Sequence, residues 1–149
     1  KLFPGLEFAF TQDCLERISK RYSYALHVAL RDGDIIGYLC VMPLSAVGYQ
    51  WCVKDGQTNI CNMDINKCFA RSLKAADAMF LEVIAFEQGA TTKERTALLG
   101  ILAFLLRSMR NKPVLATPVS EAGLQLLLRR RFKAHAREGI GSLYIKGPW

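Results

Sequence analysis

The feature that most constrains this chain is a hairpin signal at residues 24–44. Two runs rich in apolar and β-branched residues, YALHVAL and IIGYLCVMPL, flank the tetrapeptide Arg31-Asp32-Gly33-Asp34. An Asp-Gly pair supplies the backbone freedom that a tight turn requires, so the sequence predicts two antiparallel strands here. Because proline cannot donate to a sheet ladder, Pro43 is expected at or near the end of the second strand.

Strands and helices alternate in the second half of the chain. The patterns predict strands at 78–86 and 113–118, helices at 94–109 and 121–131, and two further strands within 134–145 around Glu138-Gly139-Ile140-Gly141. The segment 97–106 is apolar around almost the whole helix, which predicts a helix buried between layers. Alternation of this kind indicates a partly parallel sheet covered on both faces.

The first half is less regular outside the hairpin. We expect a short strand at 6–10 and a helix at 12–21 that is capped by Thr11, with Cys14, Leu15 and Ile18 on one face. Another Asp-Gly pair within 53–58 indicates a minor hairpin, and Asp64 is placed to cap a helix that runs to about residue 72. The predicted fold class is therefore α/β with a mixed sheet, in one domain over residues 1–149. A start at Lys1 rather than at a methionine leaves room for trimmed residues upstream.

Composition sets the outer limits. With 149 residues, 51% of them hydrophobic, the chain is too apolar for a disordered tail and long enough to bury a core. The longest uninterrupted apolar stretch, 97–106, is about half of the ~20 residues that a membrane-spanning helix needs, so no membrane association is expected. A net charge of +7 favours an anionic partner or serves solubility alone. The basic cluster at 129–137 lacks interleaved aromatics and so gives little support for RNA binding.

The five cysteines form no close pair in the sequence. An odd number without close spacing predicts reduced thiols in a cytoplasmic protein rather than a disulfide framework. The spacing of Cys52, Cys61 and Cys68 is too wide for a zinc knuckle, and the two histidines, His27 and His135, lack ligand spacing. No metal site is expected.

The segment QGATTKERTALL carries the strongest chemical signal. It joins an apolar strand to the start of a helix, where backbone N–H groups lack partners and the helix dipole favours negative charge. Lys93, Arg95 and Thr96 are placed where a phosphate or pyrophosphate would bind, and Gly89 gives the loop freedom at its start. The alternative is an ordinary solvated helix start.

These segments resemble the GNAT superfamily of acyl-CoA-dependent N-acyltransferases over about residues 6–146. The resemblance rests on three stretches, VALRDGDIIGYLCV, FLEVIAF with EQGATTKERTALLGILAFLL, and VLATPVSEAGLQLLLRRRFK. In the last stretch Ser120, Gly123 and Phe132 take the places of the family's Asn, Ala and Phe. The resemblance implies a GNAT-like architecture, in which a mixed sheet is flanked by helices.

The resemblance also implies a cofactor site. An acyl-CoA, acetyl-CoA in the simplest case, would lay its pantetheine arm along the backbone of Val83, Ile84 and Ala85. Its pyrophosphate would bind the loop 88–97, and Ser120 would lie near the arm. The residues implied in that loop are Gln88, Gly89, Lys93, Arg95, Thr96 and Ala97. The chain departs from the family where Lys93 and Arg95 occupy glycine positions and Leu127 occupies the position of a tyrosine acid.

Acyl transfer requires a base for the attacking amine and polarisation of the thioester. Glu82 is the candidate base, because it is the lone carboxylate in an apolar strand and burial would raise its pKa; an outward position at a sheet edge is the alternative. Tyr144 is a candidate acid, although a tyrosine in a strand more commonly packs in the core. By analogy with the family, Trp51, Asp64 and Lys67 lie on the acceptor side.

The acceptor amine is unknown. The positive charge slightly favours an anionic macromolecule, such as a protein tail, a ribosomal component or a charged tRNA, over a cationic small amine. The alternative reading is a catalytically degenerate GNAT-like module that acts in protein or nucleic-acid interaction.

Overall fold

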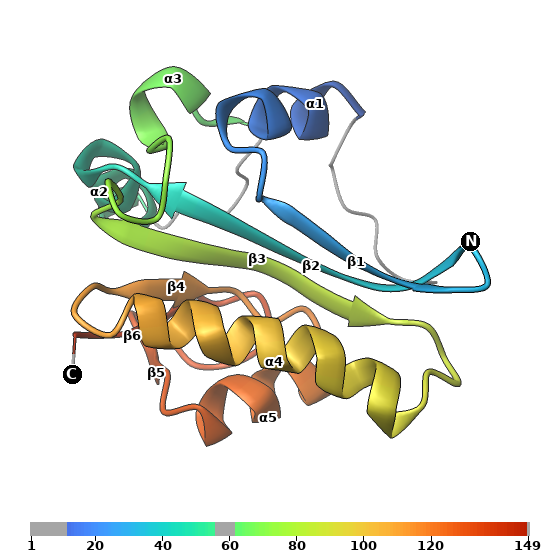
Figure 1. The fold of residues 1–149 in the computed structure, drawn as a ribbon. Coiled ribbons are helices and arrows are strands. Elements are labelled where there is room, and N and C mark those ends of the chain that lie inside the picture. The colour runs from blue at the N-terminus through green and yellow to red at the C-terminus, as the bar shows by residue number, and fades with distance from the viewer. Residues whose placement is uncertain (1–11, 56–61, 149) are drawn as a thin grey trace.

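The computed structural model describes residues 12–55 and 62–148, which build a six-stranded mixed sheet in the order β1-β2-β3-β4-β6-β5 (Figure 1). The strands are β1 Leu26–Arg31, β2 Asp34–Leu44, β3 Ala78–Phe86, β4 Val114–Ala116, β5 Lys133–Ala134 and β6 Tyr144–Lys146. The β3–β4 pair is parallel and the other pairs are antiparallel. This mixed sheet confirms the predicted α/β fold class.

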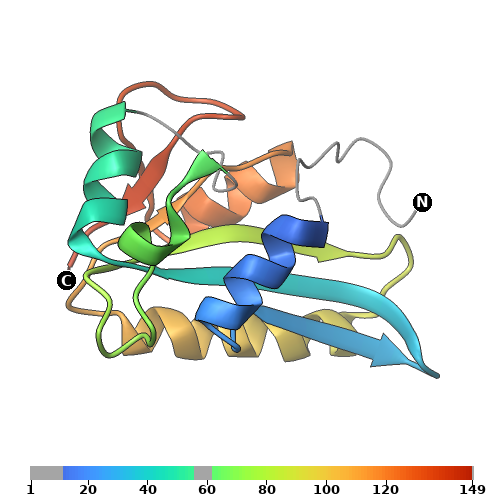
Figure 2. The same cartoon turned by 90° about the horizontal axis from the view of Figure 1, so that it is seen from above.

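Helices cover both faces of the sheet, as Figure 2 shows from above. They are α1 Gln12–Arg21, α2 Ala46–Asp55, α3 Ile65–Cys68, α4 Thr92–Ser108 and α5 Glu121–Arg129. Helices α1, α2 and α3 pack on what we call the first face, in a cluster that includes Phe80 and Leu115. Helices α4 and α5 pack on the second face, in a cluster that includes Met79 and Val114. Adjacent residues of β3, and of β4, therefore pack into the cores on opposite faces of the sheet.

The predicted hairpin is confirmed at β1 and β2. Its turn places Asp32 and Gly33 at φ values of 52° and 94°, the left-handed conformations that favour an Asp-Gly pair. Strand β2 includes Pro43 and ends one residue later at Leu44. The predicted helix at 12–21 is also confirmed, with Cys14 and Ile18 buried on one face. The predicted strand at 6–10 lies outside the described residues.

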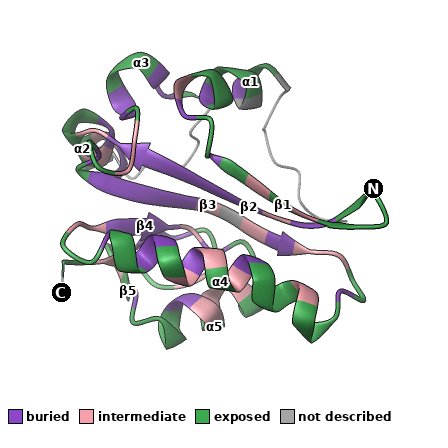
Figure 3. Cartoon of the chain, viewed as in Figure 1, coloured by how far each residue is buried: buried purple, intermediate pink, exposed green. Residues whose placement is uncertain are grey.

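The prediction that helix 97–106 is buried all round is wrong. Helix α4 lies on the outside of the second face, so only one stripe of it contacts the sheet. The buried residues, Leu98, Leu102, Leu105 and Leu106, follow helical spacing, whereas Phe104 is 66% exposed. Figure 3 shows this division along α4, with buried and exposed turns side by side.

The irregular segment after the hairpin also differs from its prediction. Helix α2 occupies residues 46–55, where part of a minor hairpin was expected, and the rest of that hairpin lies outside the described residues. Asp64 caps a helix as predicted, because its side chain accepts a hydrogen bond from the N–H of Asn66, but α3 ends at Cys68 rather than near residue 72.

The prediction of five reduced thiols is wrong for Cys14, which is disulfide-bonded. Disulfide formation depends on the distance between two residues in the fold, and sequence spacing does not set that distance. Cys40, Cys52 and Cys68 are free and buried, and Cys61 lies outside the described residues. The cysteine pattern therefore gives no basis for assigning a compartment.

Candidate functional site

Strands β3 and β4 pair in parallel along only part of β3. Their pairing ends at Leu81 and Ala116, while β3 continues for five more residues to Phe86. Along that continuation β2 pairs with one side of β3, and no strand in the described part of the chain pairs with the other side. We call this unpaired side of residues 82–86 the open edge of β3. Backbone N–H and C=O groups at such an edge can pair with an extended ligand.

The start of each following helix lies at the same end of the sheet. The carboxyl end of β3 leads into α4, and the carboxyl end of β4 leads into α5. In open α/β sheets, ligands bind outside the carboxyl ends of parallel strands. The open edge and both helix starts therefore form one candidate site.

Glu82 lies at the first residue of the open edge. It is the extra residue of a β-bulge, because Cys40 and Val41 of β2 are adjacent while their partners in β3, Val83 and Leu81, flank Glu82. The side chain is half-buried, and burial raises its pKa to about 8. The carboxylate is therefore partly removed from solvent.

The carboxylate of Glu82 lies on the first face of the sheet, close to two buried thiols. Burial, and then the charge of Glu82, raise the pKa of Cys40 to about 12. Burial, then Cys68 and last Glu82 raise the pKa of Cys52 to about 12. Both thiols belong to the first-face core, so the carboxylate lies close to them. At neutral pH these thiols stay protonated and are poor nucleophiles.

The start of α4 is closed by its own side chains. Thr91 is the N-cap, and its Oγ1 accepts a hydrogen bond from the N–H of Glu94 at 3.3 Å. The Glu94 carboxylate accepts in return from the Thr91 N–H at 2.6 Å and from the Thr91 hydroxyl at 2.9 Å. This capping box places a carboxylate where the helix dipole favours negative charge.

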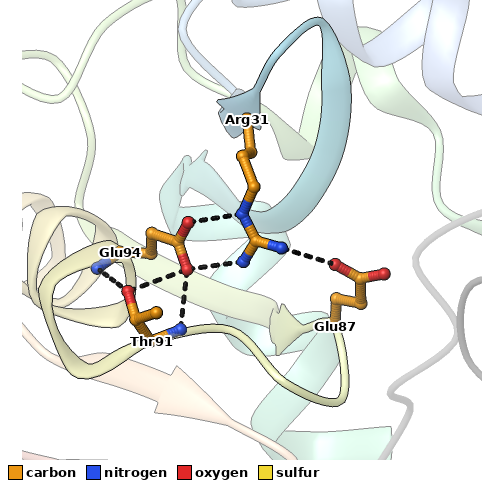
Figure 4. A network of polar contacts seen from close by, with 4 residues as sticks. All are labelled: Arg31, Glu87, Thr91 and Glu94. Carbon is orange, nitrogen blue, oxygen red and sulfur yellow. Dashed lines mark hydrogen bonds and ion pairs between the residues drawn. The ribbon is translucent and has the colours of Figure 1, made fainter.

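Arg31 from the β1–β2 hairpin binds the same carboxylate (Figure 4). Its Nε and Nη2 donate to the two oxygens of Glu94, each at 2.7 Å, and its Nη1 lies 4.0 Å from Glu87. The hydrogen bond from Arg31, with those from Thr91, lowers the pKa of Glu94 to about 2. The hairpin and the helix start are therefore joined by an ionised pair that needs no ligand.

Two backbone donors remain at this helix start. The N–H groups of Thr92 and Lys93 make no hydrogen bond with any described residue. Lys93 is exposed, Arg95 is exposed with its guanidinium 6.0 Å from the centroid of the Phe86 ring, and the hydroxyl of Thr96 donates to the carbonyl of Thr92. An anion could thus contact the two free N–H groups and the two cations, beside the position that Glu94 holds.

The remaining predicted cofactor residues are distributed along the same end of the sheet. Ile84 packs on the second face and Ala85 on the first, while Val83 is described by its backbone pairing with Cys40 alone. Gln88, Gly89 and Ala97 are exposed, and Gly89 has a φ of 103°. Ser120 is the N-cap of α5, since its hydroxyl accepts from the N–H of Gly123 at 3.1 Å.

Tyr144 is not brought together with Glu82. It is 2% exposed in the second-face core, and its hydroxyl accepts a hydrogen bond from the N–H of Gly139 at 3.0 Å. The two predicted catalytic groups therefore lie on different faces of the sheet.

One residue at this site was not predicted from the sequence. Thr117 directly follows β4, at the point where β3 and β4 part, and its Oγ1 is buried without a hydrogen bond to any described residue. An unpaired buried hydroxyl is costly, which marks it as a group that a ligand or water could satisfy. A lone threonine in a short apolar strand carries no sequence signal.

The described residues contain no group of three or more His, Cys, Asp or Glu side chains that could hold a metal ion. No described helix combines the length and apolarity needed to cross a membrane.

Comparison with known proteins gives one distant structural similarity. No protein-family model matches the chain, and no curated protein matches it at a significant level. The chain is similar in structure to the GphF GNAT-like decarboxylase in complex with isobutyryl-CoA, with a TM-score of 0.43 and 14% sequence identity. The match covers 86% of this chain and 63% of that one, so this chain spans less than two-thirds of its length.

Proposed function

We propose that this chain is an acyl-CoA-dependent N-acyltransferase that transfers an acyl group, acetyl in the simplest case, to an amine. The observation that carries the proposal is the open edge of β3 with Glu82 at its start. An extended backbone edge and a carboxylate with a pKa of about 8 are the two elements that acyl transfer to an amine needs: a place for an amide-containing arm and a base.

The arm of the acyl-CoA would pair with the open edge. Pantetheine contains amide groups, and these can exchange hydrogen bonds, as an added strand does, with those N–H and C=O groups of residues 83–85 that point away from β2. The segment comprises Val83, Ile84 and Ala85. The sequence resemblance implies the same contact. The hydroxyls of Thr117 and Ser120 lie at the neighbouring end of β4 and the start of α5, within the same site.

The diphosphate would bind at the start of α4. Its contacts would be the N–H groups of Thr92 and Lys93 and the side chains of Lys93 and Arg95. The neighbouring loop residues Gln88, Gly89, Thr96 and Ala97 complete this binding segment.

In the chemical step Glu82 takes a proton from the attacking ammonium. The free amine nitrogen then bonds to the thioester carbonyl carbon and releases its second proton to solvent, the carbon–sulfur bond breaks, and the departing thiolate takes a proton. Tyr144 is the predicted donor of that proton, but its buried hydroxyl already bonds Gly139, which favours solvent in that role. The acceptor amine, small or carried by a protein or a charged tRNA, would approach from the first face.

The proposal is tested by binding and turnover. At a hundredfold excess over its dissociation constant, acetyl-CoA should stabilise the protein by about 2.7 kcal/mol in a thermal-shift assay. The double variant Lys93→Gln/Arg95→Gln should lose much of that shift, whereas Lys133→Gln/Arg110→Gln, which removes the same charge elsewhere, should keep it. Release of free CoA thiol with a panel of amines measures turnover, and Glu82→Gln should abolish it.

One observation favours a second function. The ion pair of Glu94 with Arg31 closes the start of α4 without a ligand, as in a module that has lost its cofactor. Such a GNAT-like module would act in protein or nucleic-acid interaction. The absence of a thermal shift with acetyl-CoA and with longer acyl-CoAs would favour this second function over the first.

A further inference from the structure

A second concave site lies between α1 and α3, away from the start of α4. It has a volume of about 620 Å³, which is within the range of small-molecule sites. Its lining includes two apolar side chains, Met63 and Ile65, each less than a tenth exposed. Its walls carry four cations, Arg17, Lys20, Arg21 and Arg71. We call this site the basic pocket.

The positive charge of the basic pocket is not balanced by the described residues that line it. Asp64 is the one carboxylate among them, and it caps α3 through the N–H of Asn66 and pairs with Lys67 at 3.4 Å. Arg17 pairs with Asp13 at 3.2 Å, but both side chains are well exposed, and exposed pairs of this kind are weak. The pocket therefore keeps a clear excess of positive charge.

Arg21 is fixed in place without a carboxylate partner. Its Nε donates to the carbonyl of Phe69 at 3.0 Å, and its Nη2 donates to the carbonyls of Phe69 and Asn66 at 2.9 and 3.2 Å. These bonds use the side of the guanidinium that faces α3, and Nη1 makes no hydrogen bond with a described residue. A rigid guanidinium with unused donors is prepared to bind an oxyanion.

The three cations of α1 converge because of helical spacing. Arg17, Lys20 and Arg21 are three and four residues apart, which places them on neighbouring positions of the helix surface. Arg71 approaches from the segment after α3. Like charges held this close repel one another, and a bound anion would relieve that repulsion.

We propose that the basic pocket binds a small ligand that carries two or more linked phosphate groups. Three guanidinium groups and an ammonium match several phosphate oxygens, and planar guanidinium groups bind phosphate through paired N–H donors. The volume leaves room for an organic part beside Met63 and Ile65. This site is separate from the proposed acyl-CoA site and does not depend on it.

The test is titration calorimetry with sodium pyrophosphate at constant ionic strength. Lys20→Gln/Arg71→Gln removes two exposed cations of the pocket and spares the structural bonds of Arg21. We expect this variant to bind pyrophosphate about tenfold more weakly than the wild type, or worse, because charge-assisted bonds to phosphate are lost. The control variant Lys133→Gln/Arg110→Gln loses the same charge outside the pocket and should bind like the wild type. The single variant Lys20→Gln should lie between.

Three results would overturn the inference. The first is that pyrophosphate shows no measurable binding to the wild type. The second is that both double variants weaken pyrophosphate binding equally. The third is that a single-stranded RNA binds more tightly than pyrophosphate and is not displaced by it.

The acetyl-CoA thermal shift of the same variants separates this inference from the proposed function. If Lys20→Gln/Arg71→Gln keeps the acetyl-CoA thermal shift, the basic pocket and the acyl-CoA site are distinct. If that variant loses the shift, acetyl-CoA binds in the basic pocket, and the inference of a separate phosphate site is overturned. If pyrophosphate binds, the pocket variant weakens that binding, and acetyl-CoA gives no thermal shift, the result supports the basic pocket as a phosphate site. The same result contradicts the proposed acyltransferase function.

Discussion

Replacement of Glu82 by glutamine should change how stability depends on pH. In the folded chain burial raises the pKa of Glu82 from 4.5 to about 8, whereas the unfolded chain keeps the ordinary value. Between these two values the folded state holds a proton that the unfolded state has released. The free energy of unfolding therefore falls as pH rises through this window, and glutamine, which does not titrate, removes that fall.

The size of the effect follows from the pKa. Each pH unit within the window lowers the free energy of unfolding by at most about 1.4 kcal/mol. From pH 5 to pH 7 the wild type should therefore lose about 2–3 kcal/mol relative to Glu82→Gln, the lower figure allowing for the partial exposure of the side chain. Above pH 8 both states are ionised, and the difference should stop growing.

Urea unfolding at pH 5, 6, 7 and 8 measures this difference directly. Glu138→Gln is the matched control, because Glu138 is exposed. The free energy of unfolding of this variant should depend on pH in the same way as that of the wild type. If the gap between the wild type and Glu82→Gln is the same at all four pH values, Glu82 is not desolvated. That result would remove it from consideration as a base with a raised pKa.

Three further substitutions test individual contacts. Thr117→Val removes a buried hydroxyl that has no described partner, so urea unfolding should show a gain of about 1 kcal/mol, and a loss would mean that the hydroxyl is satisfied. Tyr144→Phe leaves the N–H of Gly139 without its acceptor and should cost about 1–2 kcal/mol in the same assay; an unchanged value would contradict that bond. Gly48→Ala would bring a Cβ within 2.3 Å of the carbonyl oxygen of Cys68, and should lower the free energy of unfolding by about 2–3 kcal/mol; a neutral result would show that α2 can shift away from α3.

Local signals in the sequence were sufficient where one short segment determines the structure. The Asp-Gly turn and its flanking strands, the bounds of β3, and the Asp64 cap each follow from neighbouring residues. The buried side of α4 does not follow from neighbouring residues, because a helix that is apolar all round does not indicate which stripe contacts the sheet. Phe104, which is exposed, shows that an apolar side chain of this helix can face solvent. The disulfide of Cys14 likewise depends on a distance that only the fold sets.

The candidate site shows the same limit. Sequence alone placed Lys93 and Arg95 at a helix start and Glu82 in an apolar strand, and both placements hold. It could not show that Arg31, 63 residues away from Glu94, would bind that carboxylate. The bulge at Glu82 and the end of β4 at Ala116 also escaped prediction, because strand register and strand length depend on partners distant in the chain.

The ion pair of Arg31 with Glu94 has a consequence for any ligand at this site. The capping box already satisfies the N–H groups of Thr91 and Glu94, and Arg31 holds the Glu94 carboxylate in place, so the helix start is ordered without a ligand. A diphosphate would gain two N–H donors there rather than the four that an uncapped helix offers. Most of the binding energy of an acyl-CoA would then come from the open edge of β3, so shortening the pantetheine arm should weaken binding more than removing a phosphate does.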